Sequence, residues 1–106
     1  MNRKQIDLLL TSGKFPPGFH QGELVETHIS YVLLGRSLAY KIKKSIKYSF
    51  LDFSTLVHRK YFCEQEVILN NRLSKGVYLG VVPIYQEEGR IIVGGTRGKI
   101  IDYAVK

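Results

Sequence analysis

The sequence predicts an α+β fold, in which a largely antiparallel sheet of about five strands carries one long helix on one face. Segments rich in β-branched and aromatic residues flank a single long helical segment, and short turns separate most of them. Strands joined by short turns lie antiparallel, and the helix can then cover one face of the sheet. The chain has 106 residues, a length that suits one domain.

Residues 1–22 are expected to form a short helix followed by a loop. Lys4–Leu10 can form the helix. Pro16 and Pro17 break the structure after it, because proline fixes φ and glycines flank the pair. Residues 23–106 then form the unit that holds the sheet and the long helix.

The next segments predict a β-hairpin. Residues 23–34 are rich in β-branched and aromatic side chains and are predicted to be strand throughout. A turn at residues 35–37 separates Ile29–Leu34 from the return strand Leu38–Lys43, so these two segments are expected to pair.

The clearest helix is predicted over Ser54–Lys75. Asp52 or Ser54 can cap its start, and Gly76 can close its end.

Three strands are predicted after the helix. Residues 77–85 and 90–95 are expected to pair through a polar turn, and residues 100–105 form the last strand.

The composition favours anionic partners. Sixteen Lys and Arg against nine Asp and Glu give a formal net charge of +7, which suits nucleotides, nucleic acid or an acidic protein surface. The same excess can also serve solubility alone. Cys63 is the single cysteine, so no intrachain disulfide can form, and no apolar run is long enough for a membrane helix. We therefore expect a cytoplasmic protein without a membrane partner.

No motif in the sequence predicts a metal site or a nucleophile. His20, His28 and His58 are scattered, and Cys63 has no second cysteine at metal-binding spacing. Residues 93–99 loosely resemble a phosphate loop but lack its first glycine, and Ser or Thr does not follow the lysine. We expect no metal ligand and no catalytic residue in this chain.

A lysine-bearing strand supplies the first candidate binding residues. Side chains alternate along a strand, so Ala39, Lys41 and Lys43 share one face. The small Ala39 beside Lys41 leaves room for a flat ligand over the strand.

The long helix supplies a candidate partner. Glu66 falls on a predicted apolar stripe with Phe62, Leu69 and Leu73. A carboxylate there is costly unless it is paired, and a strand lysine facing the helix would pair it. Glu64 is a second candidate. The spacing alone is equally compatible with a surface lysine and an unrelated carboxylate.

Three segments resemble a known family. Residues 25–45, 50–73 and 77–84 closely resemble the N-terminal part of bacterial aminoglycoside-phosphotransferase-like proteins, some of which carry an additional P-loop kinase-like domain. The resemblance runs from about Glu23 to Lys106. It implies the small lobe of a protein-kinase-like fold.

The resemblance also implies roles for individual residues. Lys41 matches the lysine that contacts the phosphates of ATP, and Glu66 matches its helix partner. Lys43 and Glu64 are the second choices, and Ala39 would lie beside the nucleotide. ATP with Mg²⁺ is the implied cofactor of a complete protein of this family.

The sequence departs from the family pattern in three places. No G-x-G-x-x-G precedes Lys41, which leaves the cradling of phosphates by a glycine loop open. Ser45 stands where members usually have proline. The last residues lie about where the hinge to a large lobe would begin, and that lobe would bring the catalytic and metal-binding aspartates. We therefore expect the large lobe to be absent, and expect this chain alone to be inactive and to bind ATP weakly or not at all.

Three functions remain open on the sequence. The favoured one is the nucleotide-binding small lobe of a phosphotransferase, and the alternatives are a non-catalytic interaction module and a basic nucleic-acid-binding domain. Nucleic acid is the least favoured partner, because most aromatic residues occupy core positions. We also expect Ile101, Tyr103 and Val105 to be uncovered and the chain to form a homo-oligomer through its cleft face.

Overall fold

The computed structural model describes the chain except for residues 18, 20, 36–37, 50, 74–78 and 96. Within that part, the chain forms two helices, a six-stranded sheet and a separate two-stranded ribbon. The elements run in the order α1 (Arg3–Ser12), β1 (Gln21–Glu26), β2 (Ser30–Gly35), β3 (Ala39–Lys43), β4 (Lys47–Tyr48), β5 (Leu51–Asp52), α2 (Leu56–Leu73), β6 (Val81–Glu87), β7 (Arg90–Val93) and β8 (Lys99–Val105).

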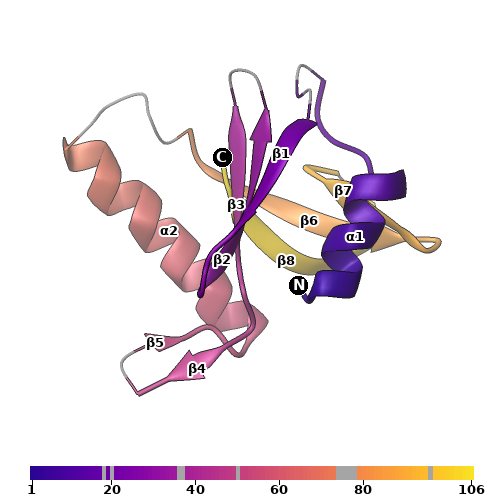
Figure 1. Cartoon of the computed structure of the whole chain (residues 1–106). Helices are drawn as coiled ribbons and strands as arrows, with labels where there is room; N and C mark the ends of the chain where they lie inside the picture. The colour runs from indigo at the N-terminus through magenta and orange to yellow at the C-terminus, as the bar shows by residue number, and fades with distance from the viewer. Residues whose placement is uncertain (18, 20, 36–37, 50, 74–78, 96) are drawn as a thin grey trace.

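The main sheet is antiparallel throughout and has the strand order β1-β2-β3-β8-β6-β7. The first three strands form a meander, and α2 then carries the chain to the other half of the sheet (Figure 1). The last strand, β8, lies between β3 and β6 and joins the two halves. The predicted α+β class, with an antiparallel sheet and a long packed helix, is confirmed, although the sheet has six strands instead of about five.

A turn interrupts the segment that was predicted to be one strand over residues 23–34. The Thr27 hydroxyl oxygen accepts hydrogen bonds from the backbone N–H groups of Ser30, at 3.0 Å, and Ile29, at 3.3 Å. The Thr27 N–H in turn donates to the Ser30 carbonyl at 2.9 Å. Threonine side chains commonly stabilise turns in this way, so β1 and β2 are two strands of a tight hairpin.

The hydrophobic core lies on one side of the sheet and includes α1. The helix is capped by a reciprocal pair of hydrogen bonds between Asn2 and Gln5, and it buries Ile6 and Leu9. The predicted helix over Lys4–Leu10 is confirmed and is one residue longer at its start and two at its end. Helix α1 and Phe19 thus share one core with the sheet. The buried core residues of the sheet are Tyr31, Leu33, Tyr40, Ile42, Ile84, Ile91, Val93 and Ala104.

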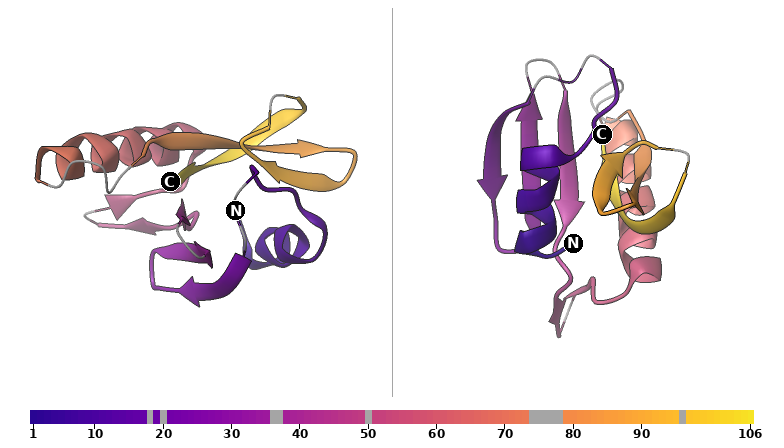
Figure 2. Two further views of the ribbon diagram at one scale, coloured as in Figure 1. Left: turned by 90° about the horizontal axis from the view of Figure 1, so that it is seen from above. Right: turned by 90° about the vertical axis from the view of Figure 1, so that its right-hand side faces the viewer.

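The long helix α2 lies along β8 on the other side of the sheet from α1 (Figure 2). The Thr55 hydroxyl accepts the backbone N–H of His58 at 3.1 Å and caps the helix start. The predicted cap by Asp52 or Ser54 is therefore wrong, because the Asp52 carboxylate instead accepts the N–H of Ser54 at 2.9 Å. The predicted helix end near Gly76 lies outside the described residues.

The predicted apolar stripe of α2 is confirmed only in part. Phe62 is half-buried and its ring centre lies 5.2 Å from that of buried Phe53, whereas the side chain of Leu73 lies outside the described residues. Polar side chains also belong to the inner face of α2. Arg59 and Cys63 are buried, and Glu66 lies further along the same face. Leu69, which was predicted to be on the packed stripe, is 54% exposed. Polar residues can occupy this face, and Leu69 can be exposed, because the polar groups of the inner face have partners on the sheet. Other large apolar side chains of α2 point to solvent, namely Val57, Tyr61 and Ile68.

One partner of the inner face is Asp102 of β8, which is fully buried. Its carboxylate accepts hydrogen bonds from the Arg59 side chain at 3.0 Å and from the Tyr103 N–H at 2.8 Å, and it pairs with the amino group of Met1. Arg59 also donates to the Phe53 carbonyl at 3.0 Å. This network anchors α2 to the last strand.

The last strand is also better covered than the sequence predicted. Val105 is only 3% exposed, and Ile101 and Tyr103 are half-buried. One reason is that α2 packs along β8, and another is that Ile101 packs against the hydrophobic core. Neither helix in the described part of the chain is long and apolar enough to cross a membrane.

Candidate anion-binding site

The candidate site starts from the alternation of side chains along β3. Tyr40 and Ile42 are completely buried in the core. Lys41 and Lys43 therefore point to the opposite face, where α2 lies. Ala39 shares this face, as predicted, and is half-buried opposite Leu34 of β2.

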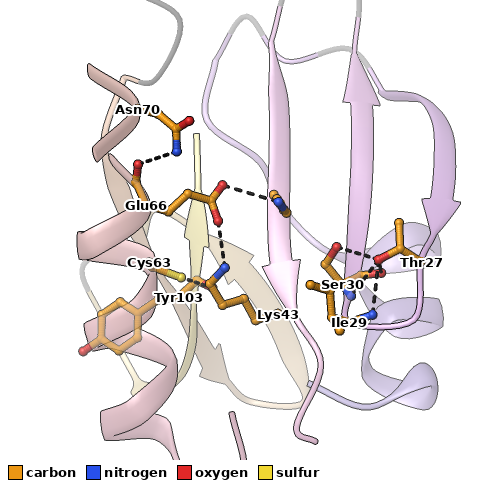
Figure 3. A network of polar contacts seen from close by, with 9 residues as sticks. Thr27, Ile29, Ser30, Lys43, Cys63, Glu66, Asn70 and Tyr103 are labelled. Atoms are coloured by element: carbon orange, nitrogen blue, oxygen red, sulfur yellow. Dashed lines mark hydrogen bonds and ion pairs between the residues drawn. The ribbon is translucent and has the colours of Figure 1, made fainter. Parts of the chain in front are cut away.

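Both lysines reach the same carboxylate. The Nζ of Lys43 lies 2.8 Å from Oε1 of Glu66, and the Nζ of Lys41 lies 3.4 Å from Oε2 (Figure 3 draws the Lys43 and Glu66 side chains). The predicted proximity of Lys41 and Glu66 is confirmed, and Lys43, the second choice, makes the shorter contact. Glu64 is exposed, and among the described ion pairs none involves it.

The two lysines differ in their surroundings. The side chain of Lys43 is 6% exposed and its ammonium lies 4.9 Å from the centre of the Phe53 ring, a cation–π contact. The side chain of Lys41 is 36% exposed. Two ammonium groups and one carboxylate together carry one net positive charge. Of the two ammonium groups, that of Lys41 is the more accessible to a ligand.

An open hollow of about 510 Å³ adjoins Lys41. It lies between β3 and the β1–β2 turn, and its wall includes the apolar side chains of Ile29 and Val32. Among the described residues, the lining is Thr27, His28, Ile29, Ser30, Val32 and Lys41. Lys43 and Ala39 do not line it. In the described part of its lining, the hollow therefore combines apolar walls with one cationic side chain, that of Lys41.

The β1–β2 turn is closed by its own hydrogen bonds. The N–H groups of Ile29 and Ser30 both donate to the Thr27 hydroxyl (Figure 3). A glycine-rich loop would instead present free N–H groups to an anion. Side chains, above all Lys41, are thus the main source of charge and donors at this hollow.

The residue pattern did not single out Thr27 and His28 as members of the site, although the family resemblance implied that residues 25–30 lie near a hairpin that covers the nucleotide. These two residues were assigned to the middle of a predicted strand, so the turn that they form was not recognised. A threonine followed by a polar residue between two apolar runs is compatible with a turn, and the turn is what places them beside Lys41. His28 is exposed at the tip of the hairpin.

Cys63 lies on the inner face of α2, one turn before Glu66. Its burial raises the pKa of the thiol to about 12, although the nearby charge of Lys43 acts in the opposite direction. The sulfur lies 4.0 Å from the Tyr103 carbonyl, to which the thiol donates a weak hydrogen bond. Cys63 is therefore a packed, protonated thiol at neutral pH, and no nucleophile.

The described residues bring together no group of three or more His, Cys, Asp or Glu side chains that could hold a metal ion. Comparison of the chain with models of known protein families, with curated proteins and with solved structures gave no match. The class that the fold and the site define is thus an α+β domain with a candidate anion site. The resemblance to phosphotransferase-like proteins stays a prediction.

Proposed function

We propose that this chain is the nucleotide-binding small lobe of an aminoglycoside-phosphotransferase-like kinase and that Lys41 binds the phosphates of ATP. The observation that carries the proposal is the position of Lys41. Its side chain lines the hollow beside the β1–β2 turn and also contacts Glu66 of α2. A strand lysine paired with a helix glutamate is the device with which protein-kinase-like enzymes hold the phosphates of ATP.

The charge and the walls of the hollow support this choice of ligand. The net positive charge of the two lysines and Glu66 favours an anion, and the partial burial of Glu66, 14% exposed, reduces its screening by water. Val32 and Ile29 offer apolar surface on which the base or sugar of a nucleotide can pack. A ligand with a phosphate chain and a flat apolar part uses both features.

Phosphoryl transfer also needs a catalytic base and carboxylates that hold Mg²⁺ on the opposite side of the nucleotide. We propose that a large lobe supplies them in a complete protein of this kind. ATP with Mg²⁺ is then the cofactor, and these 106 residues by themselves bind ATP weakly and transfer no phosphate. A free, buried Cys63 suits the reducing cytoplasm, where we place the protein.

One observation favours a second candidate, a non-catalytic interaction module. The outer face of α2 exposes Val57, Tyr61 and Ile68, which are 75%, 52% and 49% exposed. Exposed apolar groups of this kind are common at protein interfaces. The nucleic-acid alternative is weaker, because Tyr31, Tyr40 and Phe53 are buried and cannot stack on bases.

Nuclear magnetic resonance with ¹⁵N-labelled protein tests the proposed function. The chain is titrated at constant ionic strength with ATP, with inorganic triphosphate and with sulfate. We expect weak binding, with a Kd on the order of 1 mM or above, and amide shifts that gather at residues 27–32 and 41–43. ATP should bind more tightly than triphosphate if the apolar walls take part. Shifts that are equal for sulfate and ATP, or that scatter over the whole surface, would exclude a nucleotide site at Lys41.

A further inference from the structure

The structure assigns different tasks to the two lysines of β3. We propose that Lys43 neutralises and holds Glu66 and thereby leaves the ammonium of Lys41 available for the phosphate chain of a nucleotide. Lys43 is then a positioning residue and Lys41 the binding residue. The inference rests on the proposed function, which names the ligand, but it adds a division of tasks between the two lysines that the sequence pattern does not supply.

The first argument is the geometry of the shared carboxylate. Glu66 uses one oxygen for each lysine, and the shorter contact, 2.8 Å against 3.4 Å, goes to Lys43. Hydrogen bonds between charged groups are strongest near the shorter of these distances. Glu66 therefore keeps its better partner when Lys41 turns toward an anion.

The second argument is the burial of Lys43. Its side chain is 6% exposed, lies over the Phe53 ring and does not line the hollow. A phosphate chain in the hollow meets Lys41 and not Lys43. A buried ammonium without a partner is costly, so Lys43 and Glu66 depend on each other.

The third argument is a count of charges. With a single lysine, an incoming anion competes with Glu66 for the same ammonium, and the site carries no net charge. With two lysines, the site carries one net positive charge, and the anion can bind without separating Glu66 from all cations. The second lysine thus removes a competition between the carboxylate and the ligand.

Two double variants test the division of tasks, with inorganic triphosphate and ATP as probes. Lys43→Met keeps a long apolar stem over Phe53 but leaves Glu66 to Lys41 alone, so we expect roughly threefold to tenfold weaker binding. Adding Glu66→Gln removes the competing carboxylate and restores the net charge of the site. The double variant K43M/E66Q should return to within about twofold of the wild-type affinity.

The matched control reverses the lysines. The double variant K41M/E66Q has the same charge count as K43M/E66Q, but its remaining lysine is the buried one. We expect it to stay at least about tenfold weaker than wild type. If both double variants recover equally, only the charge count matters and the division of tasks is wrong. If K43M/E66Q stays weak while K41M/E66Q recovers, the tasks are the reverse of those inferred.

Folding is checked by thermal unfolding and by amide spectra of each variant. K43M/E66Q leaves no charge at positions 43 and 66, so it is the variant least expected to lose stability. Lys43→Arg gives a second reading, because a guanidinium keeps the pair with Glu66, and it should bind triphosphate as wild type does. Loss of binding in Lys43→Arg would show that the Lys43 ammonium itself contacts the ligand. Wild-type protein that gives no localised shifts with triphosphate would instead contradict the proposed function as a whole.

Discussion

Lys43 and Glu66 join β3 to α2 through an ion pair of 2.8 Å whose two side chains are 6% and 14% exposed. The pair stands where the sheet and the long helix meet, beside the polar inner face of α2. Its burial means that each partner needs the other, because a lone charge at this depth is poorly solvated.

Replacing Lys43 by methionine should therefore lower the free energy of unfolding by about 1–3 kcal/mol, since Glu66 loses its closest partner. The same change at Lys41, which is 36% exposed, should cost at most about 1 kcal/mol, because water screens that contact. Urea denaturation of the two variants measures the difference. Equal costs at both positions would show that the burial of Lys43 does not govern the stability of the pair.

The buried carboxylate of Asp102 provides a second stability prediction. Asp102→Asn leaves Arg59 without a charged partner in the interior, so we expect a loss of about 3 kcal/mol in the free energy of unfolding. Asp7→Asn is the matched control. Its side chain is 56% exposed and pairs with Arg3 on the surface, so its replacement should change the unfolding midpoint little. A small effect of Asp102→Asn would mean that the Arg59 network does not anchor α2.

The thiol of Cys63 offers a readout of folding and pH. Its pKa is raised to about 12 by burial, so the folded state disfavours the thiolate that forms in the unfolded chain near pH 9. The associated stability is complete below the unfolded pKa and is lost as the pH rises through the window from about 9 to 12. Cys63→Ala should remove this component of the alkaline loss.

The same burial should protect the thiol from reagents. At pH 8, a thiol-specific dye should label the native protein slowly and the urea-unfolded protein at once. Rapid labelling of the native protein would mean that α2 opens readily from β8, against the tight anchoring by Asp102.

Self-association should depend on salt. The net charge of +7 opposes contact between copies, and salt screens that repulsion. The cleft face is the face of the sheet that carries the hollow beside Lys41, and Val25 belongs to it because it lies opposite Val32 of β2. Apolar side chains on this face, such as that of Val25, which is 38% exposed, can then pack together. We propose a dimer through that face, so sedimentation should show larger species at high salt, and Val25→Ser should reduce them. A greater effect of Ile68→Ser on α2 would move the contact to the outer face of the helix, and a monomer at every salt concentration would exclude association.

The strand pattern made much of the fold predictable. Alternation along residues 39–43 placed Lys41 and Lys43 opposite Tyr40 and Ile42, and the structure agrees. Side chains alternate between the two faces of a strand, so the burial of one face determines to which side each residue points. The proximity of Lys41 and Glu66 followed from this facing together with the place of the helix.

The inner face of α2 was not predictable in the same way. An apolar stripe was expected around Glu66, whereas Leu69 is exposed and Arg59 is buried. Helical periodicity assumes that apolar residues face the sheet. That assumption fails where distant partners, here Asp102 of β8, neutralise buried charges. The β1–β2 turn was not predicted either, because it depends on hydrogen bonds of the Thr27 side chain, which the pattern of apolar residues does not indicate.

The central claim, that Lys41 holds the phosphates of a nucleotide, is tested most directly by matched lysine replacements. Lys41→Gln and Lys4→Gln each remove one positive charge, but Lys4 is an exposed residue of α1 on the other side of the sheet. Binding of ATP to both variants is measured by magnetic resonance at one ionic strength. We expect Lys41→Gln to weaken binding at least about tenfold and Lys4→Gln to change it less than about twofold. Equal weakening in the two variants would mean that ATP is held only by the overall positive charge, and would contradict a phosphate site at Lys41.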